Sequence, residues 1–281
     1  MPGAPDIRRS AVAGMFYPGD PAVLRRDIRR MLDGAPAPAP VGRIMGVVSP
    51  HAGYMYSGPT AAGAYRYLTE ARFETVIVIA PSHRERFAGV TVYPGDAYAT
   101  PLGPIAIDAG VRARMVMPGG CVRAAIEGHR EEHAIEVQLP FLQQLLEGFS
   151  LVPLVMGSQD AQTCAALGDA IGRCAPSGNV LIVASSDLSH YLPADRAETL
   201  DGVACDDIEA FDPEALEEDL AHGATEACGG GPIVAAMRAL KNLGATGMKV
   251  VDRCTSGDIT GDRRSVVGYC AAVAYREEGA S

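Results

Sequence analysis

The chain lacks the long apolar segment that a membrane span requires. No run of uncharged apolar residues reaches the roughly 18 that indicate a transmembrane helix. The N-terminal stretch Met1–Arg9 also lacks the apolar core of a secretory signal. We therefore expect a soluble globular protein without membrane association, located in the cytoplasm.

Positive charge is scarce as well. Lys and Arg number 24 against 34 Asp and Glu, which gives a net charge of -10. This balance repels a phosphate backbone and provides no sequence-independent affinity for nucleic acid. We expect no nucleic-acid partner.

No C-x-x-C pair is present, and the seven cysteines are scattered and odd in number. This pattern argues against a disulfide framework and a structural zinc module, and it favours a reducing compartment. Cys228 stands apart because three glycines follow it, directly before a predicted helix. A thiolate at a helix start is favoured by the helix dipole and is reactive or metal-binding. The alternative is that the glycines form a tight turn beside an inert thiol.

Strand-like and helix-like segments alternate along most of the chain. The short apolar runs 44–49 and 75–80, and the run that begins at Val180, are typical of strands buried on both faces of a parallel sheet. We predict an α/β fold in a single domain, 1–281, with a central mostly parallel or mixed sheet flanked by helices. Residues 1–40 form an N-terminal arm, a helix and an Ala/Pro linker.

Three further segments have readable patterns. Helical spacing covers 59–71 and 130–147, the second with a kink or a new helix start at Pro140. Residues 150–156 read as a strand, which Pro153 should restrict to an edge or an irregular position.

Histidines follow the apolar runs. His51, His83 and His190 each come after one of them, where a parallel sheet has its ligand-binding crevice. Imidazoles on adjacent strand ends can converge on one metal ion. The alternative is that each histidine caps a loop through a backbone hydrogen bond, but the repetition favours a metal site. The candidates for a third ligand are His190, Asp187, His133, Glu226 and Cys228.

Asp187 and His190 lie close together in the sequence and are candidates for an oriented acid/base pair, in which the carboxylate fixes the tautomer of the ring. A Ser/His/Asp hydrolase is disfavoured because neither Ser185 nor Ser186 lies in a G-x-S-x-G elbow.

A competing motif is His129-Arg-Glu-Glu-His133, which fits the H-x-x-E-H pattern of zinc metalloproteases. That pattern needs two ligands one helical turn apart with an adjacent general base. It leaves the histidines at the strand ends unexplained, so we rank it lower. Alternatively, His133 projects from the helix into the site at the strand ends.

Several phrases, in their order and spacing, resemble the Memo family. They occupy residues 13–18, 49–62, 80–83, 132–142, 185–191 and 228–233. Prokaryotic members are often called protein B of the AmmeMemoRadiSam system, a name that reflects co-occurrence with an AMMECR-type protein and a radical SAM protein. The resemblance implies these two proteins as partners.

The family's fold is similar to that of the class III extradiol dioxygenases, which hold non-haem iron(II) with two histidines and a carboxylate. Carried over by motif, the resemblance implies His51, His83 and Cys228 as metal ligands, with His133 and His190 lining the pocket. It also suggests Tyr54, in the loop after His51, as a substrate contact. A thiolate in place of glutamate favours copper, zinc or a differently tuned iron and counts against ring cleavage.

The resemblance therefore implies a metal-dependent redox protein or oxidoreductase that holds one iron or copper ion, with zinc as a third option. His190, oriented by Asp187, and His133 would be its catalytic residues, acting on an unknown small molecule or peptide. The alternatives are a non-catalytic binding or accessory protein that uses the same pocket for a peptide or partner, and the zinc metalloprotease.

Overall fold

The computed structural model describes residues 4–39, 41–175 and 179–277. Residues 1–3 of the predicted arm, Pro40 of the predicted linker and the last four residues of the predicted domain lie outside this range. Within the described part, no helix is both long and apolar enough to cross a membrane.

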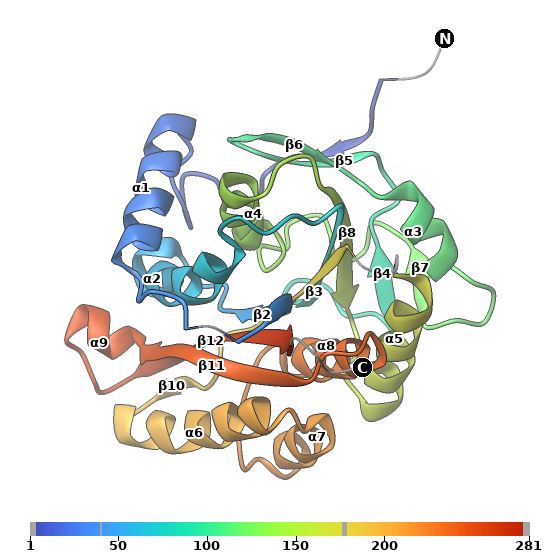
Figure 1. The fold of residues 1–281 in the computed structure, drawn as a ribbon. Coiled ribbons are helices and arrows are strands. Elements are labelled where there is room, and N and C mark those ends of the chain that lie inside the picture. Colours follow the sequence, from blue (N-terminus) through green and yellow to red (C-terminus); the bar gives the residue numbers. More distant parts are fainter. Residues whose placement is uncertain (1–3, 40, 176–178, 278–281) are drawn as a thin grey trace.

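The described residues build a mixed sheet of nine strands (Figure 1). Its strand order is β10-β12-β2-β9-β3-β8-β4-β7, with β11 paired to β12. The four central strands are parallel: β2 (Arg43–Ser49), β9 (Val180–Ser185), β3 (Thr75–Pro81) and β8 (Ser150–Met156). The predicted α/β class with a mixed sheet is confirmed.

Further strands complete the sheet on both sides, and those next to the central strands pair with them in antiparallel fashion. On the β2 side lie β12 (Val266–Arg276), β11 (Gly247–Thr255) and β10 (His190–Leu192). On the β8 side lie β4 (Val90–Val92) and β7 (Val122–Ala124). A separate small sheet consists of β1 (Ile7–Arg8), β5 (Ala97–Thr100) and β6 (Gly103–Ala106).

Helices cover both faces of the large sheet (Figure 1). One face carries α1 (Pro21–Gly34), α2 (Tyr54–Tyr65), η1 (Arg66–Leu68), η2 (Glu136–Gln138) and α4 (Leu139–Leu145). The other carries α5 (Ala161–Cys174), α6 (Ala194–Ala210), α7 (Pro213–His222) and α8 (Gly230–Asn242). The short helices α3 (Ala109–Met115) and α9 (Ser256–Thr260) lie beside them.

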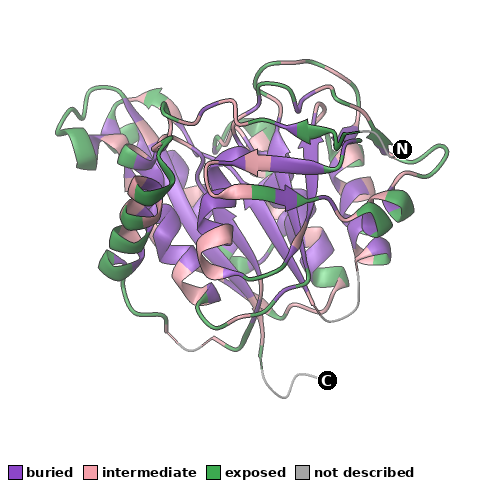
Figure 2. Ribbon diagram, turned by 90° about the horizontal axis from the view of Figure 1, so that it is seen from above, coloured by how far each residue is buried: buried purple, intermediate pink, exposed green. Residues whose placement is uncertain are grey.

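The central strands are apolar throughout because each face packs against helices. In β3, Val76 and Val78 belong to the core under α2 and α4, whereas Ile77 and Ile79 belong to the core under α5 and α8. Every residue of β3 is buried, and Figure 2 shows the central strands buried along their length. The continuous apolar runs in the sequence reflect this double covering.

The predicted helix over 130–147 is wrong in its first part. Residues 126–135 form turns and loop, and α4 begins at Leu139, with Pro140 in its first turn. The Glu132 carboxylate accepts the backbone N–H groups of His133 and Ala134, which holds the chain in a non-helical path. The predicted second helix start at Pro140 is confirmed because proline suits the first helical turn.

Two other boundaries differ from expectation. The predicted helix 59–71 begins earlier, at Tyr54, and contains Pro59. Proline cannot donate a helix hydrogen bond, and the tertiary packing of this buried helix compensates for that loss. The strand containing Pro153 is central and does not lie at an edge. Its ladder with β4 involves only residues 154–156, so the missing N–H of Pro153 disrupts no pairing on that side.

Candidate metal centre

His51 and His83 lie just beyond the carboxyl ends of β2 and β3. The sequence suggested that these two strands are adjacent. They are not, because β9 runs between them. The two imidazole rings still come within 5.0 Å, measured between centroids. The strand between them ends in Ser185, whose hydroxyl oxygen lies 3.0 Å from Nδ1 of His51.

Cys228 reaches the same point from the loop before α8. Its Sγ lies 3.1 Å from Nε2 of His51, and donor atoms of His51, His83 and Cys228 lie within 4.8 Å of one another. Gly229 makes this approach feasible because a Cβ at its position would lie 2.3 Å from the Ser185 carbonyl oxygen. The structure thus brings the three predicted metal ligands together.

Hydrogen bonds set the tautomer of His51. The Ser185 hydroxyl donates to the Ala134 carbonyl, so its oxygen accepts from Nδ1–H of His51 at 3.0 Å. The lone pair on Nε2 then faces Cys228. Burial, followed by the neighbouring His83 and His133, lowers the pKa of His51 well below 6.5, so the ring is neutral at pH 7.

The thiol of Cys228 is also neutral in the absence of a cation. Burial, followed by the nearby Asp187 carboxylate, raises its pKa to about 12. A metal ion would displace the thiol proton and receive two imidazole nitrogens and one sulfur, a donor set that suits iron, copper or zinc. The residues therefore fit a metal ion.

Glu132 and His133 border this donor group. Nδ1 of His83 lies 2.9 Å from Glu132 Oε1, and the His83 backbone N–H donates to Oε2 at 2.6 Å. The His133 ring lies 4.8 Å from that of His83 and 5.3 Å from that of His51. His133 is therefore where the sequence suggested, although a loop carries it there.

Sequence reasoning missed the contact between Glu132 and His83. The only signal was the glutamate of the H-x-x-E-H motif, which pointed to a different chemistry. His83, Glu132 and His133 form a second group of donor atoms within 4.8 Å of one another.

Asp187 supports the loop after β2. Its carboxylate accepts the backbone N–H of His51 at 2.7 Å, and its carbonyl accepts that of Cys228 at 3.2 Å. Burial raises the pKa of Asp187, although the hydrogen bond from the His51 backbone and the nearby His190 act to lower it.

The expected pairing of Asp187 with His190 is not made. In the described structure no hydrogen bond joins the two side chains, because the Asp187 carboxylate is turned to the backbone of His51. His190 is not at a strand end either: β9 stops at Ser185, and His190 begins the edge strand β10. His190 is half-buried and close enough for its charge to influence Asp187.

Tyr54 and Glu226 lie outside the donor group. Tyr54 is buried, its hydroxyl donates to the Val137 carbonyl at 2.7 Å, and its ring packs against Tyr17 and Phe141. Substrate contact by Tyr54 stays a prediction. Glu226 is exposed, so it does not supply the carboxylate that its proximity to Cys228 in sequence suggested.

The metalloprotease hypothesis is wrong because its two histidines are not one helical turn apart. The segment between them is not helical. His129 is fully buried, with Nδ1 bonded to the Tyr98 hydroxyl, and belongs to neither donor group.

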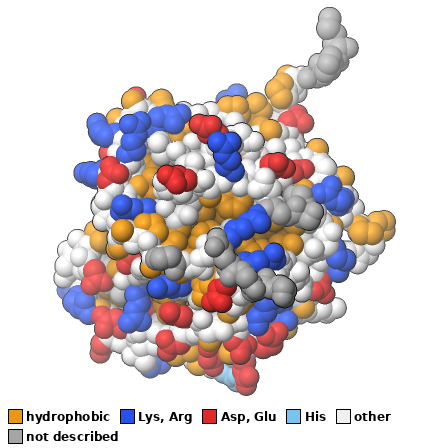
Figure 3. Space-filling model, in the orientation of Figure 1, with side chains coloured by type: hydrophobic (Ala, Val, Ile, Leu, Met, Phe, Trp, Pro, Cys, Tyr) orange, Lys and Arg blue, Asp and Glu red, His pale blue; other side chains and the backbone are white. Residues whose placement is uncertain are grey.

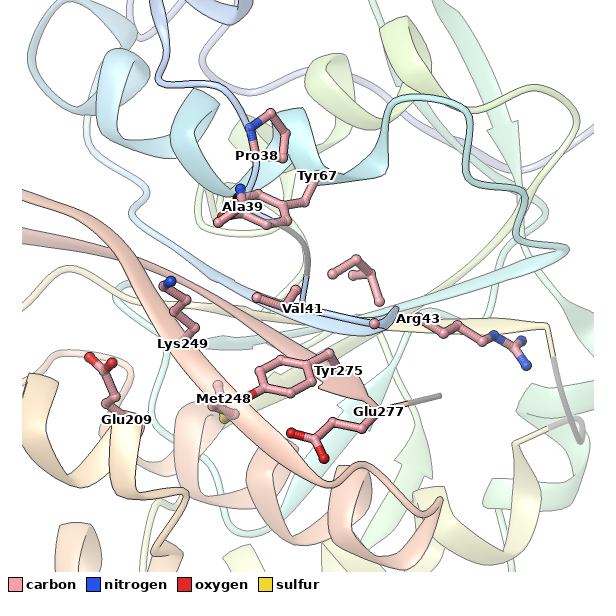
Figure 4. A pocket seen from close by; sticks show the side chains of 12 residues that line it. Pro38, Ala39, Val41, Arg43, Tyr67, Glu209, Met248, Lys249, Tyr275 and Glu277 are labelled. Carbon is pink, nitrogen blue, oxygen red and sulfur yellow. Dashed lines mark hydrogen bonds between the residues drawn. The ribbon is translucent and has the colours of Figure 1, made fainter. Parts of the chain in front are cut away.

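A large cavity lies at the opposite end of the sheet. Its volume is about 970 Å³, and its lining includes Arg43 at the start of β2, whereas His51 of the candidate metal site follows the end of β2. Figure 4 shows Tyr275 in its wall, with Lys249 and Glu209 to one side. Figure 3 shows hydrophobic side chains across this hollow face with basic ones beside them. The cavity is separate from the metal centre.

Comparison with known proteins matches almost the whole chain. The family model described as Memo-like protein covers residues 8–273. A MEMO1 family protein of Methanothermobacter thermautotrophicus is 39% identical over 272 residues, covering 94% of this chain and 98% of the relative. MEMO1 family proteins of Methanopyrus kandleri (38% identical; 96% and 99% covered) and Methanocaldococcus jannaschii (37%; 95% and 98%) match similarly. The chain therefore belongs to the Memo family.

Proposed function

We propose that this chain is a metal-dependent redox protein in which His51, His83 and Cys228 hold one iron or copper ion. The observation that carries the proposal is the convergence of two imidazoles and one thiol at the carboxyl ends of the central strands, with Cys228 Sγ 3.1 Å from His51 Nε2. His51 and Cys228 are 177 residues apart in the sequence, so local structure does not account for their meeting.

The donor set can hold a redox metal. Imidazole suits iron, copper and zinc, and a thiolate favours the softer ions among them. Iron or copper would supply one-electron chemistry and activation of a small molecule such as dioxygen, whereas zinc would bind without redox change. Three protein donors leave coordination positions open for a small substrate or a peptide group.

The neighbouring residues would support this chemistry. His133 lies beside His51 and His83 and would accept or donate protons at the substrate. His190, half-buried at the edge strand, would exchange protons with solvent. Asp187 would hold the loop of His51 and the backbone of Cys228 in place. A cytoplasmic location, and partnership with AMMECR-type and radical SAM proteins, belong to the same proposal.

Electron paramagnetic resonance of iron- and copper-loaded protein tests the redox role. Ascorbate should reduce the bound ion, and dioxygen should reoxidise it, through repeated cycles. The Cys228→Ser variant should show an altered spectrum and slower cycling. Cys121→Ser is the matched control, because Cys121 is also half-buried but lies outside both donor groups. A bound ion that never changes oxidation state would contradict the proposal.

A second candidate is a binding or accessory protein. Met15 on the arm and Met55 on α2 expose 73% and 71% of their surface beside a small groove, a feature that favours docking of a peptide or protein. Recovery of one stable partner with wild-type Cys228 and with Cys228→Ala alike, together with absent redox cycling, would support this candidate over the first.

A further inference from the structure

Glu132 is a buried carboxylate with an unusual set of neighbours. Its side chain accepts four N–H groups: the backbone and Nδ1–H of His83, and the backbones of His133 and Ala134. Arg8 donates to the Glu132 carbonyl and not to its carboxylate. The negative charge is therefore held by the two loops that carry His83 and His133.

These four donors take up most of the hydrogen-bond accepting capacity of Glu132. An ionised carboxylate has about four lone-pair sites for hydrogen bonds. Oε1 accepts three of the four N–H groups and Oε2 accepts one, so Oε1 has no lone pair left for Nδ1 of His133, which lies 3.1 Å away and has no hydrogen bond. The second donor group, His83 with Glu132 and His133, is thus a hydrogen-bonded cluster.

We propose that Glu132 is a positioning residue of the metal centre, which holds His83 in the Nδ1–H tautomer so that Nε2 faces His51 and Cys228. The proposal rests on the metal site proposed above. Glu132 does for His83 what Ser185 does for His51: it occupies Nδ1 and leaves Nε2 as the donor. A carboxylate behind a metal-binding imidazole also increases the basicity of the ring.

Glu132→Gln separates this role from simple space filling. An amide has one accepting oxygen and one donating NH₂, whereas both ends of Glu132 accept N–H groups. If the NH₂ faces Nδ1 of His83, the ring must move its proton to Nε2, which removes the lone pair needed for a metal. If the NH₂ faces the backbone N–H of His83, two donors meet and the loop shifts.

Zn²⁺ titration against a chromophoric chelator measures the effect. Glu132→Gln should bind Zn²⁺ about 10 to 100 times more weakly than the wild type. The matched control is Asp201→Asn, which also neutralises a buried carboxylate, but one that accepts the backbone N–H of Ser189 and belongs to neither donor group. Its Zn²⁺ affinity should stay within about twofold of wild type.

Long-range ¹H–¹⁵N NMR of the metal-free protein reads the tautomer of His83 directly. His83 should carry its proton on Nδ1, and in Glu132→Gln the Nε2–H form should increase. Unchanged Zn²⁺ affinity in folded Glu132→Gln would overturn the proposal, as would an Nε2–H tautomer of His83 in the wild type.

The His51→Ala variant separates a failure of the metal site from a failure of the role proposed for Glu132. If the wild type binds Zn²⁺ no better than His51→Ala, the metal centre itself fails and the role of Glu132 fails with it. If the wild type binds more tightly than His51→Ala but Glu132→Gln equals the wild type, only the role of Glu132 is refuted.

Discussion

The approach of Cys228 to His51 depends on the missing side chain of Gly229. A Cβ at that position would lie 2.3 Å from the Ser185 carbonyl oxygen, a backbone atom that cannot move without disturbing the end of β9. A glycine is required here by close packing, since its φ is negative.

Gly229→Ala should therefore push the Cys228 loop away from the sheet. We expect Zn²⁺ affinity to fall at least tenfold and the free energy of unfolding to drop by about 1–3 kcal/mol, as for other overpacked sites. Gly202→Ala in α6 is the control: no atom lies within 4 Å of the added Cβ, so it should stabilise by about 0.5–1 kcal/mol and leave the affinity unchanged. Equal affinities for both variants would refute the packing argument.

His129 should make stability depend on pH. Burial, followed by the charge of Arg8, lowers its pKa from 6.5 to about 3. Between these values the unfolded state binds the extra proton, so the free energy of unfolding falls on acidification by up to about 1.4 kcal/mol per pH unit from this group. Urea titrations between pH 7 and 4 should show a smaller slope for His129→Gln, and identical slopes would contradict this assignment.

At the scale of elements, the N-terminal arm is tied to the loop before α4. The buried Glu136 carboxylate pairs with Arg8 and accepts the Tyr17 hydroxyl at 2.6 Å. The preceding arm residue, Phe16, packs its ring 4.8 Å from that of His133. The arm thus packs beside the candidate metal site through His133 and is part of the domain.

Glu136→Gln should leave the buried Arg8 charge without a counter-ion. We expect a loss of about 3 kcal/mol in the free energy of unfolding, measured by urea denaturation. Glu198→Gln removes an exposed ion pair with Arg263 and should cost less than about 1 kcal/mol. A comparable loss in both variants would show that the arm is not held by a buried charge pair.

The sequence predicted individual strands and helices better than it predicted which of them lie side by side. The runs at 44–49 and 75–80 identify strands because they are apolar and β-branched, but nothing in them shows that β9 runs between these strands. The bond between His83 and Glu132 spans 49 residues and depends on a loop where helical spacing suggested a helix. His190 was misplaced for a related reason, because the polar stretch after Ser185 hid the end of β9.

At the scale of the whole molecule, two cores share one sheet. Leu139 lies in the core under α2 and α4, and Ile233 in the core under α5 and α8, both fully buried. Strand β3 contributes to both cores, so neither face can unfold while the other stays packed.

Leu139→Ala and Ile233→Ala should therefore lower the midpoint of the same single unfolding transition. Each should cost about 2–5 kcal/mol, as for other large-to-small changes in a core. Far-UV circular dichroism and tyrosine fluorescence should give coincident curves for both variants. Separate transitions, or a variant that shifts only one probe, would indicate two independently folding parts.

The central claim is that one metal ion is held at the carboxyl ends of the central strands. Protein purified anaerobically without chelators, followed by elemental analysis, tests it most directly. We predict about one equivalent of iron or copper in the wild type and near-complete loss in His51→Ala and Cys228→Ala, with Cys121→Ser unchanged. Metal at background level in the wild type, or an equal content in all four proteins, would contradict the claim.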